Sequence, residues 1–258
     1  MNILEQIVTH KRQEVEQRKK EVGVNELESE RFFSRKVYSL KQFIVDPTKT
    51  GVIAEYKRKS PSKGVINDVD SVESVTRMYA GFGASGISVL TDYHFFGGSL
   101  DDLVAARDND VPLLRKDFMI DEYQILEAKA FGADVILLIA ACLTPTEVKR
   151  LATAAKKLGL EVLLELHHES ELDHICSEVD LVGVNNRNLK NFEVDLQHSV
   201  HMAEKIGNDF IKIAESGISD VSNIRFLKQH GFQGFLIGEH FMKQEDPGKA
   251  FKEFTYSL

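Results

Sequence analysis

The sequence predicts an α/β fold, a (β/α)8 or TIM barrel preceded by a helical extension. Short apolar runs typical of β-strands recur eight times after residue 50, with helical patterns between them. Successive runs start 20 to 35 residues apart, and this alternation implies parallel strands joined by crossovers. A doubly wound open sheet is the alternative. No G-x-G-x-x-G motif follows the first run, which disfavours its dinucleotide-binding form.

The composition is that of a globular protein. The chain has 258 residues, of which 43% are hydrophobic and 28% are charged. No linker-like segment divides it, so we expect residues 1–258 to form a single barrel domain with residues 1–45 as its helical extension. The net charge of −8 and the lack of a basic tract disfavour nucleic acid as a partner.

Cysteine usage and hydropathy indicate a cytoplasmic protein. Cys142 and Cys176 are the only cysteines, and we expect two reduced thiols rather than a disulfide or a metal site. The N-terminus lacks the apolar core of a signal peptide. No apolar run approaches the roughly 20 residues that a membrane helix needs, so we expect no membrane partner.

Residues 1–45 carry helical patterns and no strand pattern. Ile3, Leu4 and Ile7 recur at helical spacing, and a second helical piece is predicted over residues 25–35. The pattern is that of an extension packed on a larger body, with a dimerisation arm as the alternative. The expected oligomeric state is a monomer or a weak homodimer.

The first predicted strand, Gly51–Tyr56, changes from apolar to polar residues as it ends. Residues two apart in a strand share a face, so Glu55 and Lys57 point the same way as Ile53. A salt bridge at a solvated strand edge is the plain alternative for this charge pair. The seven further strands are predicted at Gly86–Leu90, Pro112–Leu114, Asp134–Ile139, Glu161–Leu164, Leu181–Val184, Phe210–Ala214 and Gly234–Ile237.

Helical patterns separate these strands. Val72, Val75 and Tyr79 lie at helical spacing between the first two strands. Another helix follows a Thr–Pro start signal and ends at Gly159. The predicted helices are Ser71–Phe82, Glu122–Phe131, Thr146–Leu158, Asp220–Gln229 and Pro247–Phe254.

Polar residues follow nearly every strand. In a parallel barrel the C-terminal ends of the strands converge on one mouth, where active sites form. Acidic and basic side chains gathered there would approximately balance one another and shift one another's pKa values. The residues concerned are Glu55 and Lys57 after the first strand, Lys116 after the third, Glu165 after the fifth, Asn185 and Arg187 after the sixth, and Glu215 after the seventh.

The last two strand ends indicate a phosphate site. Both carry glycine, in A-E-S-G-I and in I-G-E-H, and barrel enzymes often bind phosphate there through backbone N–H groups. Tight turns at Gly217 and Gly238 are the alternative. Ser60, Ser62 and Lys63 of the first loop supply further donors.

Other candidate residues favour ordinary structural roles. His167 and His168 are adjacent, which is the wrong geometry for two metal ligands on one strand face, so we expect no metal site. Phe96 and Phe118, beside strand ends, are either capping hydrophobes or walls of an aromatic pocket.

Seven motifs, in order along essentially the whole chain, resemble those of indole-3-glycerol phosphate synthases. They are I-A-E-Y-K-R-K-S-P-S-K-G, S-V-L-T-D-Y-H-F-F-G-G-S, L-L-R-K-D-F, L-L-E-L-H, V-N-N-R-N-L, I-A-E-S-G-I and L-I-G-E-H-F-M. The resemblance implies a carboxy-lyase of tryptophan biosynthesis that uses no cofactor. It would convert 1-(2-carboxyphenylamino)-1-deoxyribulose 5-phosphate into indole-3-glycerol phosphate, releasing carbon dioxide and water.

The resemblance also implies catalytic roles. Lys116 matches the general acid that protonates the substrate's ketone oxygen, and Lys57 matches the cation that holds its carboxylate; which lysine delivers the proton stays open. Glu165 matches a carboxylic acid of raised pKa that protonates the departing hydroxyl. Glu55 matches a group that holds and tunes either the lysines or the departing hydroxyl, and the orienting positions match Asn185, Arg187 and Glu215.

Substrate-binding residues follow from the same resemblance. Glu239 is expected to contact the phosphate through its backbone, because its carboxylate would repel the anion. The residues matched are Ser60, Ser216, Gly217, Gly238 and Glu239 for the phosphate, and Phe96, Phe118 and Leu189 for the anthranilate ring.

Three residues depart from the commoner forms of the family, namely Tyr56, Lys59 and Asn188. By strand alternation Tyr56 points away from the mouth, and the other two would alter loop charge rather than reaction type. A phosphoribosylanthranilate isomerase-like barrel is the nearest rival function, but it predicts cysteine and aspartate at the strand ends. A barrel that has lost catalysis is the second rival, and it would not need all of these charged residues.

Overall fold

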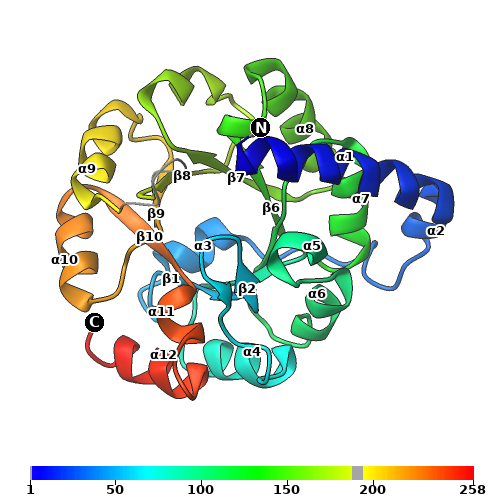
Figure 1. Cartoon of the computed structure of the whole chain (residues 1–258). Coiled ribbons are helices and arrows are strands. Elements are labelled where there is room, and N and C mark those ends of the chain that lie inside the picture. The colour runs from blue at the N-terminus through cyan, green and yellow to red at the C-terminus, as the bar shows by residue number, and fades with distance from the viewer. Residues whose placement is uncertain (1, 188–193) are drawn as a thin grey trace.

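The eight predicted strands close into a barrel (Figure 1). The computed structural model describes residues 2–187 and 194–258. Strands neighbour one another in the order β1-β10-β9-β8-β7-β6-β5-β4, and each registered pair is parallel, so the predicted fold class is confirmed. The strands are β1 (Val52–Tyr56), β4 (Gly86–Leu90), β5 (Leu113–Lys116), β6 (Val135–Ile139), β7 (Glu161–Leu166), β8 (Leu181–Asn185), β9 (Ile211–Glu215) and β10 (Phe232–Ile237).

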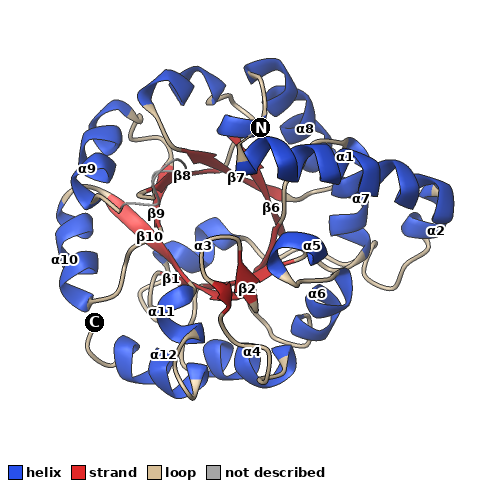
Figure 2. Ribbon diagram, in the orientation of Figure 1, coloured by secondary structure: helices blue, strands red, loops and turns tan. Residues whose placement is uncertain are grey.

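Helices surround the barrel, and all five predicted ones are present (Figure 2). Two crossover helices, α6 and α9, were not predicted, and the crossover from β7 to β8 is the 3-10 helix η2 (Glu169–His174). A small hairpin, β2 (Lys59–Ser60) with β3 (Gly64–Val65), follows β1. The outer helices are α4 (Val72–Gly81), α6 (Leu100–Ala106), α7 (Glu122–Ala130), α8 (Pro145–Lys157), α9 (Leu196–Lys205), α10 (Val221–Gln229) and α12 (Pro247–Thr255), with short pieces α5 (Tyr93–Phe96), η1 (Ala140–Cys142) and α11 (Glu239–Met242).

The core has two layers, and strand alternation sorts residues between them. Ile53 packs inside the barrel with Leu163 and Leu236. Tyr56 belongs to the outer layer between strands and helices, where its hydroxyl donates to the Asp70 carbonyl over 2.8 Å. The predicted outward direction of Tyr56 is therefore confirmed.

The segment before β1 forms three helices, α1 (Ile3–Glu21), α2 (Val24–Glu28) and α3 (Leu40–Val45). Helix α1 starts at a capping box made by Asn2 and lies over one edge of the barrel mouth (Figure 1). Helix α3 was not predicted, and its Leu40 and Ile44 join the cluster inside the barrel.

The predicted helix over residues 25–35 is wrong in length. Helix α2 ends at Glu28, and turns follow it. These turns bring Arg35 back to the barrel, where its guanidinium lies 2.6 Å from the Asp134 carboxylate. Tertiary ion pairing therefore overrides a helical pattern that is weak without an apolar stripe. Within the described residues, no helix has both the length and the apolar character needed to cross a bilayer.

Candidate active site

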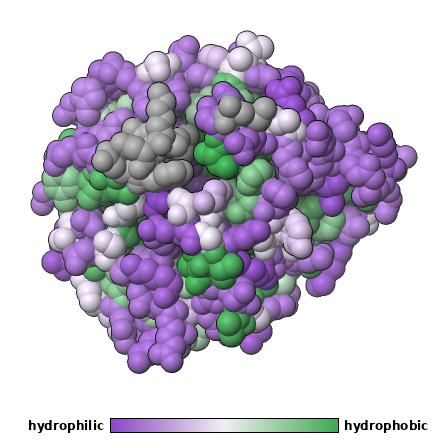
Figure 3. All heavy atoms as spheres, in the orientation of Figure 1, coloured by the Kyte–Doolittle hydropathy of each residue, from purple (hydrophilic) through white to green (hydrophobic). Residues whose placement is uncertain are grey.

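A cavity of about 870 Å³ lies at the C-terminal ends of the barrel strands. Every predicted site residue that the structure describes lines it, and Leu189 lies outside the described residues. Helix α1 contributes three apolar side chains that the sequence did not assign to the site, namely Ile3, Leu4 and Ile7. Figure 3 shows this face of the molecule as largely hydrophilic with apolar patches.

Lys116 stands between two carboxylates at the ends of β7 and β9. Its Nζ lies 2.8 Å from Glu215 Oε2 and 3.2 Å from Glu165 Oε2. A second pair comes from β1, where Lys57 Nζ lies 2.7 Å from Glu55 Oε1. Glu55 is 3% exposed, so the pair is a salt bridge that faces the cavity rather than a solvated strand edge. The two lysines therefore sit in separate acidic settings.

The two carboxyls beside Lys116 have pKa values shifted in opposite directions. Burial favours the neutral form of both. For Glu165, Lys116 and then His167 outweigh burial and lower its pKa. For Glu215, burial and the charge of Glu165 outweigh Lys116 and raise its pKa. The expectation of a raised pKa at Glu165 is therefore wrong; the raised pKa belongs to its neighbour Glu215, and the two carboxyls titrate as a pair.

The remaining charges of this cluster are held in their ionised forms. Burial acts against the ammonium of Lys116, but Glu215, Glu165 and Glu55 outweigh it and raise its pKa. Burial also acts against the carboxylate of Glu55, but Lys57 and then Lys116 outweigh it and lower its pKa. A preformed ammonium at the wall of this cavity is a strong electrostatic partner for developing negative charge.

Two glycines make room for these carboxylates. A Cβ at Gly183 would lie 2.2 Å from Glu215 Oε1, and one at Gly238 would lie 2.6 Å from Glu55 Oε1. Both distances are well inside van der Waals contact. Gly238 was predicted for phosphate binding or a tight turn. Its φ is not left-handed, so the backbone conformation does not require glycine. The space that Gly238 leaves for Glu55 is a further reason for glycine here.

The predicted phosphate-binding residues gather at another part of the same cavity. The hydroxyl of Ser60 is buried and lacks a hydrogen-bond partner among the described residues, and an unmatched buried donor is costly unless a ligand satisfies it. Ser216 has φ 67°, the left-handed region that serine rarely adopts, and Gly217 follows with φ 73°. Strain at such a turn is typical of a binding site.

Arg187 and Glu239 face each other across this region. Arg187 Nη2 lies 3.0 Å from Glu239 Oε2. The backbone N–H of Arg187 also donates to Asn185 Oδ1 over 3.0 Å, which helps to position the residue. The carboxylate of Glu239 is thus engaged by a guanidinium, which leaves its backbone as the part that an anion can approach.

An apolar wall completes the cavity. The rings of Phe96 and Phe118 have centroids 6.0 Å apart at 37°, within the range of favourable aromatic contact. Leu137 and Ile139 of β6 line the cavity beside them, and Ile7 of α1 is added from the mouth. The arrangement suits a flat aromatic ring, and both phenylalanines line the cavity rather than only capping strands.

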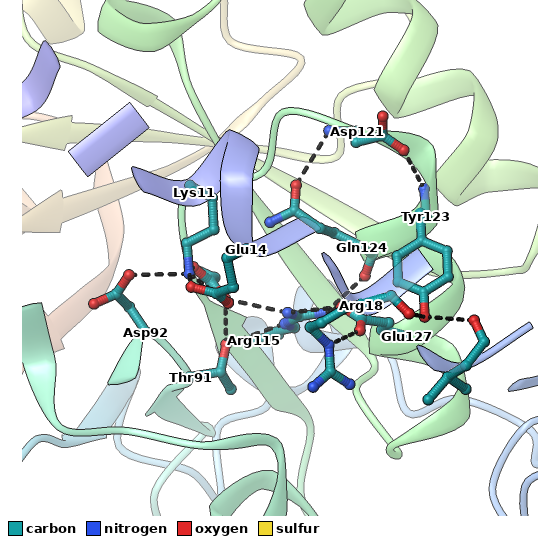
Figure 4. A network of polar contacts seen from close by, with 12 residues as sticks. Lys11, Glu14, Arg18, Thr91, Asp92, Arg115, Asp121, Tyr123, Gln124 and Glu127 are labelled. Carbon is teal, nitrogen blue, oxygen red and sulfur yellow. Dashed lines mark hydrogen bonds and ion pairs between the residues drawn. The ribbon is translucent and has the colours of Figure 1, made fainter. Parts of the chain in front are cut away.

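Sequence reasoning missed a second charged network next to this site (Figure 4). Lys11 reaches from α1 to Asp92 and Asp117, with its Nζ at 2.9 Å and 3.0 Å from their carboxylates, and all three side chains are 0% exposed. Arg115 extends the network, with Nη2 3.1 Å from Asp117 Oδ2. Asp117 directly follows Lys116 in the sequence, so the network fixes α1 to the strand that carries Lys116.

His167 was also set aside and lies in the cavity wall. It follows Glu165 by two residues, so the alternation rule that paired Glu55 with Lys57 would have placed it on the same face. No group of histidine, cysteine and acidic side chains suited to a metal ion occurs among residues 2–187 and 194–258. Cys142 and Cys176 are both free thiols.

Comparison with known proteins identifies one family. A family model described as Indole-3-glycerol phosphate synthase matches residues 4–254. The indole-3-glycerol phosphate synthase of Bacteroides thetaiotaomicron is 44% identical over 265 residues, covering 100% of this chain and 99% of that protein. The one of Salinibacter ruber is 42% identical over 254 residues, covering 97% and 94%.

Solved structures with low identity share the architecture. Tryptophan synthase subunit alpha from Legionella pneumophila matches with a TM-score of 0.62 at 14% identity, covering 84% of this chain and 94% of that one. A 3-hexulose-6-phosphate synthase from Salmonella typhimurium matches with a TM-score of 0.64 at 12% identity, covering 80% and 97%. At these identities the likeness shows the fold alone.

Proposed function

Since this chain belongs to the indole-3-glycerol phosphate synthase family, we propose that the cavity at its barrel mouth is the catalytic centre of that carboxy-lyase reaction. The substrate is 1-(2-carboxyphenylamino)-1-deoxyribulose 5-phosphate, a small phosphorylated molecule of tryptophan biosynthesis. Ring closure releases carbon dioxide and then water. The observation that carries the proposal is Lys116, whose ammonium is held between Glu165 and Glu215 in a cavity that also contains the unsatisfied Ser60 hydroxyl.

Lys116 is the proposed acid for ring closure. As the aryl carbon attacks the ketone, negative charge develops on the ketone oxygen, and the Lys116 ammonium donates a proton to it. An alkoxide is far more basic than an amine, so a lysine of raised pKa still protonates it. Glu215 lies 2.8 Å from Nζ, so it can relay a proton taken up from solvent to the lysine afterwards, and the proton that the pair itself holds remains for dehydration.

Lys57 is the proposed partner of the substrate carboxylate. Its direct ion-pair partner is Glu55, at 2.7 Å, which keeps the ammonium at the cavity wall. Loss of carbon dioxide removes the negative charge that Lys57 binds. The Lys57 ammonium therefore favours binding of the carboxylate substrate before ring closure. After carbon dioxide has left, Lys57 pairs with Glu55 again, as in the free protein.

The pair Glu165 and Glu215 is the proposed proton source for dehydration. The departing hydroxyl needs one proton to leave as water, and the pair holds one proton between two carboxyls. The donor is therefore assigned to the pair, in which Glu215 has the raised pKa. Asn185 and Arg187 are proposed to orient the substrate.

The phosphate is proposed to lie between the β1 loop and the last two strand ends. Ser60 donates its hydroxyl, and Ser216, Gly217 and Gly238 offer backbone N–H groups at the turns after β9 and β10. Glu239 contributes its backbone because its carboxylate is paired with Arg187. Phe96 and Phe118 would hold the anthranilate ring, and the same role for Leu189 stays a prediction.

Several coarser properties belong to the same proposal. We infer that residues 1–258 act as one barrel domain with residues 1–45 as its extension, as a monomer or weak homodimer in the cytoplasm. The two free thiols and the biosynthetic family support this location. The net charge of −8 supports a protein that does not bind nucleic acid.

The proposal is tested by product fluorescence. The chain has no tryptophan, so its own emission comes from tyrosine, and indole product adds a distinct signal when the substrate is mixed with protein. We expect a rise in indole emission that depends on protein concentration. A folded wild-type protein that yields no such signal would refute the assignment.

A further inference from the structure

We propose that His167 is a positioning residue that holds the Glu165 carboxylate from the side opposite Lys116. This inference rests on the proposed role of Glu165 in the reaction. The two oxygens of Glu165 face different nitrogens: Oε2 lies 3.2 Å from Lys116 Nζ, and Oε1 lies 3.3 Å from His167 Nε2. Each oxygen of the carboxylate therefore has one nitrogen within ion-pair distance.

The imidazole of His167 has no other polar partner among the described residues. It is 3% exposed, and neither ring nitrogen makes a hydrogen bond of good geometry. The contact with Glu165 has the distance of an ion pair but not yet the alignment of a hydrogen bond. Leaving a buried polar group unmatched is unfavourable, and a small rotation of Glu165 would remove this cost.

His174 provides the contrast within the same region. Its Nε2 lies 2.8 Å from the Leu143 carbonyl oxygen, and its Nδ1 lies 3.0 Å from the Glu171 carbonyl oxygen. Both ring nitrogens thus lie within hydrogen-bond distance of backbone carbonyl oxygens, and Nδ1 also lies 2.9 Å from Asp173 Oδ1, as expected of a histidine that stabilises a turn. His167, which lines the cavity, has no such backbone partner, so a purely structural role does not account for it.

Backbone hydrogen bonds fix the position of His167. Its N–H donates to Glu171 Oε2 over 2.6 Å, and the N–H of His168 donates to the same oxygen over 3.1 Å. Any substitution of the His167 side chain keeps this anchor. The orientation of Glu165 can therefore be tested without removing the turn that follows β7.

The experiment compares three variants in the indole fluorescence assay. His167→Leu removes the nitrogen that faces Glu165, and we expect kcat to fall roughly tenfold to hundredfold, the effect of one hydrogen bond to a charged group, while KM changes by less than about threefold. His167→Gln carries a donor on its longer amide arm and is expected to recover most of kcat. His168→Leu is the matched control on an exposed neighbour and is expected to resemble wild type.

The outcomes separate this inference from the proposed function. Equal kcat in His167→Leu and His168→Leu, or a His167→Gln variant that is folded and no better than His167→Leu, would overturn the positioning role. If His167→Leu does not fold, His167→Asn takes its place, because its shorter amide falls short of Glu165; equal kcat in the Asn and Gln variants then refutes the role. A wild-type protein without turnover would instead refute the proposed function.

Discussion

Lys11 and Lys116 are both lysines surrounded by carboxylates, and they lie on two sides of the same strand end. Lys11 is 0% exposed in the packing between α1 and the barrel, with Asp92, Asp117 and Glu14 as partners. Lys116 is 15% exposed at the wall of a cavity, with Glu165 and Glu215 as partners. The chemistry of the two sets is alike, and the surroundings differ.

The surroundings decide whether the carboxyl groups of each set are all ionised or retain a proton. At Lys11, burial disfavours the Asp117 carboxylate, but Lys11 and Arg115 outweigh it and lower the pKa of Asp117, so a fully ionised network results. At Lys116, burial and the charge of Glu165 raise the pKa of Glu215, so a proton is stored. A matched network stabilises, whereas a mismatched one retains a transferable proton.

The largest effect expected is on turnover in Lys116→Met. Without the ammonium the ketone oxygen loses its proton donor, and we expect kcat to fall by roughly 10²–10⁴-fold. The free energy of unfolding should change by less than about 2 kcal/mol, because the two remaining carboxyls already share a proton. Steady-state indole fluorescence and urea unfolding measure the two quantities.

Lys57→Met is the matched control for this variant. Removal of the cation proposed for the substrate carboxylate is expected to raise KM more than it lowers kcat. If Lys57→Met instead loses as much kcat as Lys116→Met with an unchanged KM, the assignment of the two lysines is reversed.

Lys11→Met is expected to show the opposite balance. It leaves Asp92 buried without the Lys11 ammonium and leaves Asp117 paired with Arg115 alone, and breaking a buried pair in this way costs about 3–5 kcal/mol of folding free energy. Turnover per folded molecule should fall far less than in Lys116→Met. Urea unfolding measures the loss of stability, and active-site titration gives the turnover per folded molecule. A urea midpoint equal to that of wild type would show that the network does not fix α1 to the barrel.

The pH dependence of stability is expected to have opposite signs in the two sets. The folded pKa of Glu215 is raised, so its contribution is full below the ordinary glutamate pKa and is lost as pH rises through the folded value. Glu215→Gln should therefore gain stability relative to wild type as pH rises. The folded pKa of Asp117 is lowered, so its contribution is full above the ordinary aspartate pKa and is lost as pH falls.

Asp117→Asn is the second arm of that measurement. Its deficit in the free energy of unfolding should be largest near neutral pH and shrink toward acid. Melting temperatures across a pH series report both differences. If the difference in melting temperature from wild type changed with pH in the same direction for Glu215→Gln and Asp117→Asn, the proposed difference between the two sets of carboxyls would be contradicted.

The smallest effect is expected in Ser60→Ala. The Ser60 hydroxyl has no partner in the part of the chain that the structure describes, so its removal should leave the free energy of unfolding unchanged or slightly higher. KM should rise roughly tenfold with little change in kcat, because one hydrogen bond to a charged phosphate is lost. An unchanged KM would remove Ser60 from the phosphate site.

Local patterns were sufficient for the barrel and for most of the site. All eight strands were found because parallel strands are apolar on both faces and stop at abrupt polar residues. Strand alternation placed Glu55 and Lys57 toward the cavity and Tyr56 away from it. Helix α3 was missed because its six residues are too few to display a period.

The sequence by itself determined which residues stand at the barrel mouth, because the two-residue period of a strand and the convergence of parallel strand ends are local rules. Only the tertiary structure decided where the proton lies and what Lys11 and His167 contact. Those properties depend on distances between strands that are far apart in the chain, such as the 2.8 Å from Lys116 to Glu215. A pKa is set by burial and by every charge around the group, and no sequence window contains them all.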